Sequence, residues 1–304
     1  MPGRASDPFI TVIIAVYNDK EKLEHSLSAL LNTSFTNFEV IVVDDGSDDS
    51  PQLIANQFSC KFIRLPLNRG QAYARNRGVE ESKGDIILFT DADCVVMKDW
   101  VKNMADELTK LHQECREVVA IIGRLVSKND FIEMCHAYTG YGYIQNGLKR
   151  EINYLNTACV GIYKEVFLKV GGFSEDFKVN EDTNLGFELS EHGYKIIFEP
   201  KIYVYHDHGI RTFKEFILKH RNWGKSLGLK FELRHKKRLG VFLPLFLNPI
   251  THLFLIVPVA FLTTIKIVKY NILAEKRILL YFPFIFLGKI SFRWGIFCSE
   301  CQRT

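Results

Sequence analysis

Residues 86–96 read IILFTDADCVV, an apolar run that contains two carboxylates, Asp91 and Asp93. The apolar residues predict a buried strand, because strands covered on both faces read as continuous hydrophobic runs. Three further runs of this kind precede it: FITVIIAVYN (9–18), FEVIVVDDGSDD (38–49) and CKFIRLP (60–66). Segments with a helical pattern separate them. Strands that alternate with helices predict an α/β fold with a Rossmann-like, doubly wound and mostly parallel sheet.

Polar residues end three of these strands, at Tyr17-Asn18, at Asp44-Asp45 and at Asp91 and Asp93. Ligands of doubly wound sheets bind beyond the carboxyl ends of the strands. Residues i and i+2 of a strand point to the same face, so Asp91 and Asp93 are expected to point the same way. They predict a partial site for Mn²⁺ or Mg²⁺, which proteins hold with one or two carboxylates plus substrate phosphates. Alternatively, one Asp caps the next helix and the other is solvated.

Two other acidic pairs also allow a structural and a functional interpretation. Asp44 and Asp45 precede Gly46 and are either turn residues or acceptors for a base or ribose, with Asp45 suited to the ring N–H of a uracil-like base. Glu181 and Asp182 begin a predicted helix, where the dipole favours negative charge. They are either helix-start acids or the general base that takes a proton from an acceptor hydroxyl.

His206 and His208 flank Asp207 at the end of a predicted strand. As residues i and i+2 they are expected to face the same way, and one of them could complete a metal site. We take His208 as the third metal ligand beside Asp91 and Asp93. Surface histidines at the end of a strand are the alternative interpretation.

The C-terminal part predicts membrane association. Residues 211–240 hold ten Lys and Arg against two acidic residues, and 241–265 contain no charged residue. A second apolar run, 278–297, is interrupted by Lys289 and Arg293. We expect a sheet domain over 1–230, followed over 231–304 by a basic linker and a membrane hairpin or interfacial helices. A buried C-terminal subdomain is the alternative, and no pattern indicates nucleic-acid binding.

Cysteine usage and the N-terminus bear on the compartment. The seven cysteines are scattered and odd in number, which favours a reducing compartment. Cys298 and Cys301 form a single CxxC, which without a second pair is weak evidence for zinc. The polar start MPGRASDP predicts no signal peptide. We therefore expect a protein of the cell membrane whose catalytic domain is cytoplasmic.

Taken together, the motifs resemble the family-2 inverting glycosyltransferases with the GT-A fold. The resemblance covers about residues 9–225, and its segments are TVIIAVYN (11–18), VIVVDDGSDDS (40–50), NRGQAYARNRG (68–78), FTDADC (89–94), VGGF (170–173) and EDTNLGFEL (181–189). It implies an inverting sugar transfer from a nucleotide-sugar, with a UDP-sugar favoured, and a divalent cation, Mn²⁺ or Mg²⁺.

The resemblance also implies residue roles. The residues implied to bind the nucleotide-sugar are Ala15, Tyr17, Asp44, Asp45, Arg75, Asp91 and Gly172. Asp93 would ligate the metal, while Asp91 contacts the ribose or a metal-bound water. Asp182 matches the catalytic base with Glu181 beside it, and Gly171, Gly172 and Phe173 would shape the acceptor side.

The chain departs from the processive members of this family, which carry a Gln-x-x-Arg-Trp motif. The nearest segment, LKHRNWG (218–224), lacks the Gln and separates Arg221 from Trp223, so transfer of one or a few sugars is expected. The basic block and apolar tail favour a lipid-linked acceptor in cell-envelope glycan or glycolipid synthesis. A sugar nucleotidyltransferase and a non-catalytic, membrane-anchored nucleotide-sugar-binding scaffold are the alternatives, and the first lacks its Gly-rich loop in AVYNDKEK (15–22).

Overall fold

The computed structural model describes residues 8–127, 130–142, 147–234, 249–273 and 275–301. The described chain forms two compact units. The sheet unit comprises Met1–Val126, Leu148–Asp176 and Glu181–His206, and the helical unit comprises Ser127–Gly147, Phe177–Asn180 and Asp207–Thr304. The expected domain boundary at residue 230 falls inside the last long helix before the apolar tail. Most of the expected basic linker lies outside the described residues.

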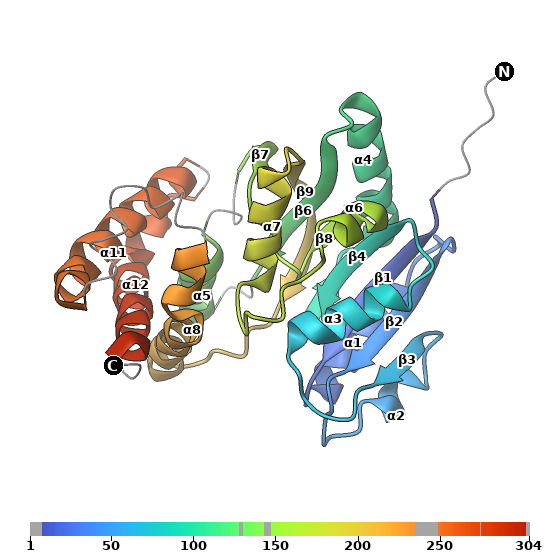
Figure 1. Ribbon diagram of the computed structural model, residues 1–304, viewed down its shortest axis with the longest axis horizontal. Coiled ribbons are helices and arrows are strands. Elements are labelled where there is room, and N and C mark those ends of the chain that lie inside the picture. Colours follow the sequence, from blue (N-terminus) through green and yellow to red (C-terminus); the bar gives the residue numbers. More distant parts are fainter. Residues whose placement is uncertain (1–7, 128–129, 143–146, 235–248, 274, 302–304) are drawn as a thin grey trace. The chain divides into compact units, whose positions relative to one another are not determined.

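The sheet unit is built on one mixed sheet with strand order β3-β2-β1-β4-β8-β6-β9-β5, and β7 pairs with β9 (Figure 1). The strands are β1 (Ile10–Val16), β2 (Phe38–Asp44), β3 (Lys61–Arg64), β4 (Ile86–Asp91), β5 (Cys94–Val96), β6 (Val118–Val126), β7 (Arg150–Ile152), β8 (Val160–Tyr163) and β9 (Lys195–His206). β1 to β4 pair in parallel, and β8 runs antiparallel to both β4 and β6. The prediction of a doubly wound, mostly parallel sheet is confirmed.

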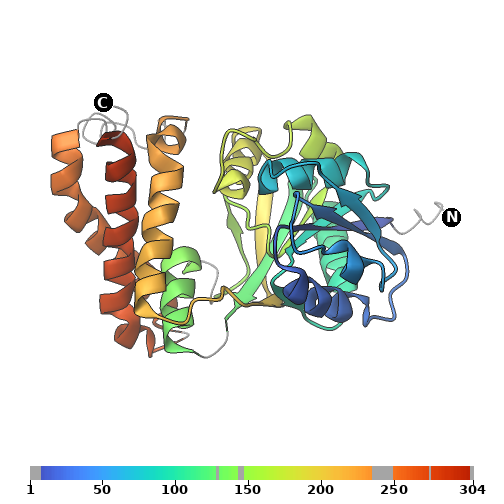
Figure 2. The same ribbon diagram turned by 90° about the horizontal axis from the view of Figure 1, so that it is seen from below.

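Helices cover both faces of this sheet, so its central strands are buried (Figures 1 and 2). The helices of the sheet unit are α1 (Lys20–Leu31), α2 (Gln52–Ala55), α3 (Gln71–Glu80), α4 (Trp100–Glu114), α6 (Lys164–Lys169) and α7 (Glu181–Glu191). Ile13 of β1 and Phe89 of β4 have no more than 1% of their surface exposed, as expected for continuous apolar runs. The hydrophobic core therefore fixes the strands whose carboxyl ends carry the acids.

The helical unit contains α5 (Phe131–Tyr141), α8 (Phe213–Arg234), α11 (Pro249–Asn271) and α12 (Ile278–Cys301). Two helices, Ile250–Asn271 and Ile278–Ser299, are long and apolar enough to cross a membrane. The expected pair of apolar C-terminal helices is confirmed, and residues 241–248 of the first apolar run lie outside the described residues.

Candidate active site

The carboxyl ends of three adjacent strands bring the predicted nucleotide-site residues together. In the strand register, Ala15 of β1 lies opposite Asp91 of β4, and Val16 lies opposite Asp44 of β2. Tyr17 follows directly and has 48% of its surface exposed. These side chains therefore share one edge of the sheet, where ligands of such sheets bind.

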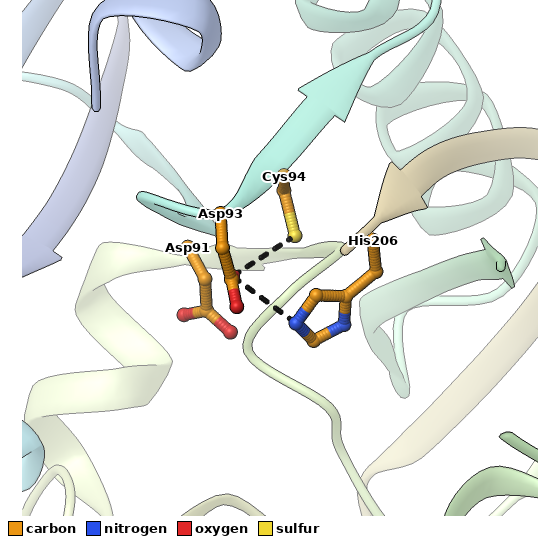
Figure 3. Close-up of side chains that lie close together, drawn as sticks. All are labelled: Asp91, Asp93, Cys94 and His206. Carbon is orange, nitrogen blue, oxygen red and sulfur yellow. Dashed lines mark hydrogen bonds and ion pairs between the residues drawn. The ribbon is translucent and has the colours of Figure 1, made fainter. Parts of the chain in front are cut away.

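A cluster of four side chains lies at this edge, formed by Asp91, Asp93, Cys94 and His206 (Figure 3). One potential ligand atom from each side chain lies within 4.8 Å of those of the other three. His206 Nε2 lies 3.1 Å from Asp93 Oδ1. The two arrive from distant parts of the chain because β5 pairs antiparallel with β9, which sets Cys94 opposite His206.

The local backbone differs from the expected extended strand. β4 ends at Asp91, and Asp93 lies in the turn that leads into β5. The i, i+2 argument for one strand therefore does not account for the proximity of Asp91 and Asp93. The turn between two strands brings their carboxylates together instead, and neither residue is the N-cap of α4, which begins after Asp99.

The chemistry of this cluster fits a hard divalent cation. Carboxylate oxygen and imidazole nitrogen bind such ions, whereas thiolates favour softer metals. Cys94 is fully buried, and burial together with the negative charges of Asp93 and Asp91 raises the pKa of its thiol well above the usual value. A thiol is in any case a softer ligand than this class of ion prefers. Asp91, Asp93 and His206 are the residues that could hold the ion.

His208, which we took from the sequence as the third ligand, is placed elsewhere. Its ring stacks on Tyr141 at 5.4 Å between centroids and lies 4.5 Å from the ring of His136, both in the helical unit. The group of potential ligands among the described residues contains His206 rather than His208. Which of two neighbouring histidines joins the cluster follows from the pairing of β9 with β5, which the sequence pattern did not predict.

Arg75 of α3 joins the acid cluster to the start of α7. Its guanidinium donates from Nη2 to Asp91 Oδ1 at 2.7 Å and from Nη1 to Glu181 Oε1 at 2.6 Å. Arg75 has 3% of its surface exposed and Glu181 has 1%. Buried charges require such pairing. Arg75 thus bonds two carboxylates and positions both, and its implied contact with the nucleotide-sugar stays a prediction.

Asp182 lies next to Glu181 and is partly exposed. Its carboxylate accepts hydrogen bonds from the backbone N–H of Thr157 at 3.3 Å and of Thr183 at 2.6 Å. Burial and the negative charge of Glu181 raise the pKa of Asp182 to about 7, against the lowering effect of Arg75. A general base works best when its pKa is near the operating pH, so Asp182 can perform this role. The deeply buried Glu181 is placed to position Arg75 rather than to meet substrate.

Asp44 and Asp45 organise the loop after β2. Asp44 is fully buried and accepts from the backbone N–H of Ser47 at 2.8 Å and from Arg64 at 3.0 Å. Asp45 accepts from the backbone N–H groups of Arg69 at 2.9 Å and Gly70 at 2.8 Å. Asp44 therefore supports the loop, and its implied role in binding the nucleotide-sugar stays a prediction. Asp45 has 3% of its surface exposed, and its expected contact with a base stays a prediction.

The VGGF segment is fixed to α3. Asn76 donates to the backbone carbonyl of Phe173 at 2.8 Å and accepts from the Phe173 N–H at 3.0 Å. Gly172 has a positive φ of 69°, and a Cβ there would lie 3.0 Å from both Asn76 and Phe167. Only glycine adopts this backbone without strain, so Gly172 shapes the turn through its backbone. Gly171, also at positive φ, precedes it.

Two partnerships at the site were not predicted from the sequence. The residues that Arg75 joins are 16 and 106 positions away in the chain. The contact of Asp182 with Thr157 joins α7 to the segment before β8. The acids in the first turn of α7 were a visible signal, but their partners follow from the packing of α3 and α7.

Known proteins match this chain in sequence and in fold. The family model of glycosyl transferase family 2 matches residues 11–171, more than half of the chain. The chain therefore belongs to glycosyl transferase family 2, and it is an enzyme of that family.

Relatives in sequence carry out glycosyl transfer in different settings. The chain is 27% identical over 231 residues to the glycosyltransferase AglE of Haloferax volcanii, covering 72% of this chain and 73% of that one. It is 28% identical to the pre-mycofactocin glycosyltransferase of Mycobacterium tuberculosis, covering 68% and 44%. It is 27% identical to the poly-beta-1,6-N-acetyl-D-glucosamine synthase of Staphylococcus epidermidis, covering 63% and 48%. The match thus spans less than half the length of the last two relatives.

Solved structures share the fold. The mannosyltransferase PcManGT of Pyrobaculum calidifontis, in complex with GDP-Man and Mn²⁺, superposes with a TM-score of 0.64 at 18% identity, over 98% of this chain and 88% of that one. GalNAc-T7 with UDP, GalNAc and Mn²⁺ gives a TM-score of 0.54 at 15% identity, over 72% and 49%. Together with the family match, these likenesses show the GT-A fold.

Proposed function

We propose that the protein is an inverting, metal-dependent glycosyltransferase that moves a sugar from a nucleotide-sugar to a hydroxyl or phosphate acceptor. The observation that carries this proposal is the joining of two groups through Arg75. One group is the cluster of Asp91, Asp93 and His206, and the other is the helix start that holds Asp182. A set of metal ligands and a base whose pKa is raised to about 7 lie at one edge of the sheet. This pair of groups suits a reaction in which the acceptor displaces the diphosphate from the sugar carbon in one step.

Asp93 and His206 would hold Mn²⁺ or Mg²⁺, with Asp91 beside them. The bound cation supplies Lewis-acid stabilisation of the negative charge on the departing diphosphate. The structures of PcManGT and GalNAc-T7 both contain Mn²⁺ with a nucleotide or nucleotide-sugar, which supports this assignment.

Asp182 would accept the proton of the acceptor. In this step the acceptor oxygen forms a bond to the anomeric carbon, the bond from that carbon to the diphosphate breaks, and the proton passes to Asp182. A nucleoside diphosphate leaves, and the configuration at carbon inverts because attack is opposite to departure. The Thr157 and Thr183 N–H groups orient the carboxylate for this transfer.

Ala15, Tyr17 and Asp45 would surround the nucleotide base. The preference for a UDP-sugar rests on Asp45, which is suited to accept from the ring N–H of uracil. PcManGT was solved with GDP-Man and GalNAc-T7 with UDP, so the fold accommodates both nucleotides. Direct measurement of the donor is therefore the first experiment.

A lipid-linked acceptor in cell-envelope glycan or glycolipid synthesis is favoured by the two apolar helices. Six free cysteines among the described residues support a reducing compartment and hence a cytoplasmic sheet unit. The S. epidermidis relative is a poly-beta-1,6-N-acetyl-D-glucosamine synthase, which is compatible with the envelope setting.

The test incubates the full chain in lipid with a panel of nucleotide-sugars, Mn²⁺ or Mg²⁺, and a lipid extract as acceptor source. Nucleoside diphosphate release is recorded for the wild type and for Asp93→Ala. We expect release with one donor and a loss of about 10³-fold or more in the variant, the scale of an electrostatic catalytic group. The matched control is Asp106→Asn, at an exposed position of α4, and it should leave the rate unchanged. Donor binding without release under every condition would instead favour a non-catalytic binding protein.

A further inference from the structure

The arrangement of the long helices within the helical unit bears on how the protein meets a membrane. α8 and α12 lie side by side, with the start of α8 against the first part of α12 and the middle of α8 against its later part. These contacts are Phe213 with Phe284, Ile217 with Ser291, Arg221 with Gly295, and Gly224 with Phe292. Gly224 and Gly295 allow the two backbones to touch, because a Cβ at either position would overlap the facing carbonyl. α8 and α12 are therefore parallel and closely packed.

α11 packs against α12 at a different set of positions. Phe261 contacts the rings of Phe282 and Phe286 at 6.1 and 5.8 Å between centroids, and His252 contacts Phe297 at 6.3 Å. These pairs run in opposite orders along the chain, so α11 is antiparallel to α12. Within this unit α12 lies between α8 and α11, as Figure 2 shows.

The outer faces of this three-helix row differ in chemistry. The apolar outer face of α11 consists of exposed residues at helical spacing: Ile250, Leu253, Phe254, Val257, Leu262 and Ile265. Exposure reaches 75% of the Phe254 surface. Exposed cations occupy the outer side of α8 instead: Lys214, Lys219, Arg221 and Lys225. Polarity therefore changes across the helix axes, from basic on α8 to apolar on α11.

The direction of this change distinguishes two modes of membrane association. A spanning bundle is apolar in the middle of each helix and polar at its ends, so polarity changes along the axes. An interfacial helix has one apolar and one charged face, so polarity changes across the axis. The row formed by α8, α12 and α11 has the second pattern.

A spanning orientation would place cations at the wrong depth. The segment of α8 that carries Lys219, Arg221 and Lys225 lies beside Gly288–Ile296 of α12, in the interior and second half of the apolar stretch Ile278–Ser299. If α12 crossed the bilayer, the parallel α8 would carry these exposed cations into hydrocarbon. Charged groups at that depth are unfavourable and normally face a protein interior.

We propose that α8, α11 and α12 form an interfacial unit whose helix axes lie in the plane of the membrane, with the apolar outer face of α11 inserted into one leaflet. α12 lies above α11, and α8 presents its cations to water and to anionic headgroups. Lys266 and Lys269, exposed near the end of α11, are placed to reach headgroups beside the inserted face. The partner is a lipid leaflet containing anionic lipid.

This proposal rests only on the membrane association included in the proposed function, and sugar transfer in detergent is unaffected if it fails. Two protease-cleavage sites in one full-length chain test the orientation. One is inserted beside Lys276, in the turn between α11 and α12, and the other beside Gly193, in the turn between α7 and β9. The chain is reconstituted into sealed vesicles of phosphatidylcholine and phosphatidylglycerol.

We expect external protease to cut both sites in the same molecules, since both turns lie on one side of the membrane. The doubly cut fragment should appear at equal yield before and after detergent is added. Cleavage at only one site in intact vesicles, with both cut only in detergent, would show that the hairpin crosses the bilayer and would overturn the proposal.

Vesicle flotation tests the inserted face itself. Phe254→Lys should reduce the fraction of protein that floats with the vesicles several-fold, while Leu53→Lys, at an exposed apolar residue of the sheet unit, should not. Nucleoside diphosphate release in detergent verifies that both variants fold. Equal flotation of Phe254→Lys and wild type would overturn the proposal, as would a wild type that associates with itself through α11 and does not float.

Discussion

The two units place their charges in opposite ways. In the sheet unit, Arg75 and Glu181 are almost fully buried and bond each other, and Arg75 also bonds Asp91. In the helical unit, exposed cations lie on α8, and α11 exposes a row of apolar residues that includes Phe254 and Leu262. Burial strengthens electrostatic interactions and makes unpaired charge unfavourable. The buried pairs of the sheet unit can therefore fix the positions and the pKa values of the acids around Arg75. The helical unit exposes its cations and its apolar residues to a partner outside the chain.

The largest effect is expected at Asp182. Asp182→Asn keeps the size of the side chain and removes the proton acceptor, so the rate of transfer should fall by about 10²–10⁴-fold. Nucleotide-sugar binding, measured by calorimetry with Mn²⁺, should change little. A variant that turns over at the wild-type rate would remove Asp182 from the mechanism.

The same residue gives opposite pH dependences for activity and for stability. Activity should rise as pH increases through about 7, because the base must lose its proton. The pKa of Asp182 is raised on folding, so the folded state binds more protons between pH 4 and 7, and its contribution to stability falls as pH rises through that range. Asp182→Asn should therefore melt a few degrees higher than wild type at pH 8 and at the same temperature near pH 4. Identical melting shifts at both pH values would argue against the raised pKa.

The next largest effect is expected at Arg75. Arg75→Met leaves Glu181 buried without its partner, so the free energy of unfolding should fall by about 3–5 kcal/mol. Urea unfolding measures this change. Lys61→Met is the matched control, because it breaks an exposed pair with Glu81 and should change stability by about 0–1 kcal/mol.

A double variant sharpens the interpretation of Arg75. Replacing Glu181 by Gln in the Arg75→Met background removes the unpaired buried charge, so it should restore part of the lost stability. Glu181 has no substrate role in our account. The double variant should therefore be inactive for one reason, which is that loss of Arg75 displaces Asp182. No recovery of stability would mean that the cost of Arg75→Met comes from lost packing.

A smaller effect is expected in the helical unit, where packing rather than charge joins the helices. Gly224→Leu introduces a side chain where Gly224 faces the Phe292 carbonyl, so α8 and α12 must separate. Overpacking of this kind reduces stability by about 1–3 kcal/mol. Ser226→Leu, at an exposed position on the same helix, is the control and should have little effect. Thermal unfolding in detergent measures both, and equal melting temperatures would contradict the close helix contact.

Sequence reasoning predicted the strands of the sheet well, because each is a short apolar run ending in acids. The location of Asp91, Asp93 and Asp45 at the sheet edge followed from the rule for doubly wound sheets. The two apolar helices followed from length and composition. These features depend on neighbours in the chain, which a single sequence shows directly.

The remaining features depend on contacts between distant segments. The choice of His206 over His208 follows from the pairing of β5 with β9, about 110 residues apart. The partners of Arg75 follow from the packing of α3 against α7. α8 did carry a helical signal, since Phe213, Phe216, His220, Gly224 and Leu227 recur at helical spacing, but its many cations led us to describe the segment by charge alone.

The most direct test of the account compares the two histidines. Nucleoside diphosphate release is measured against Mn²⁺ concentration, with the preferred donor and a lipid acceptor source, for the wild type, His206→Ala and His208→Ala. We predict that His206→Ala needs at least about tenfold more Mn²⁺ for half-maximal release, the lower end of the effect of a metal-site substitution. The Mn²⁺ dependence of His208→Ala should match the wild type. A shift in His208→Ala alone, or release that does not depend on added metal in any variant, would contradict a metal site at Asp93 and His206.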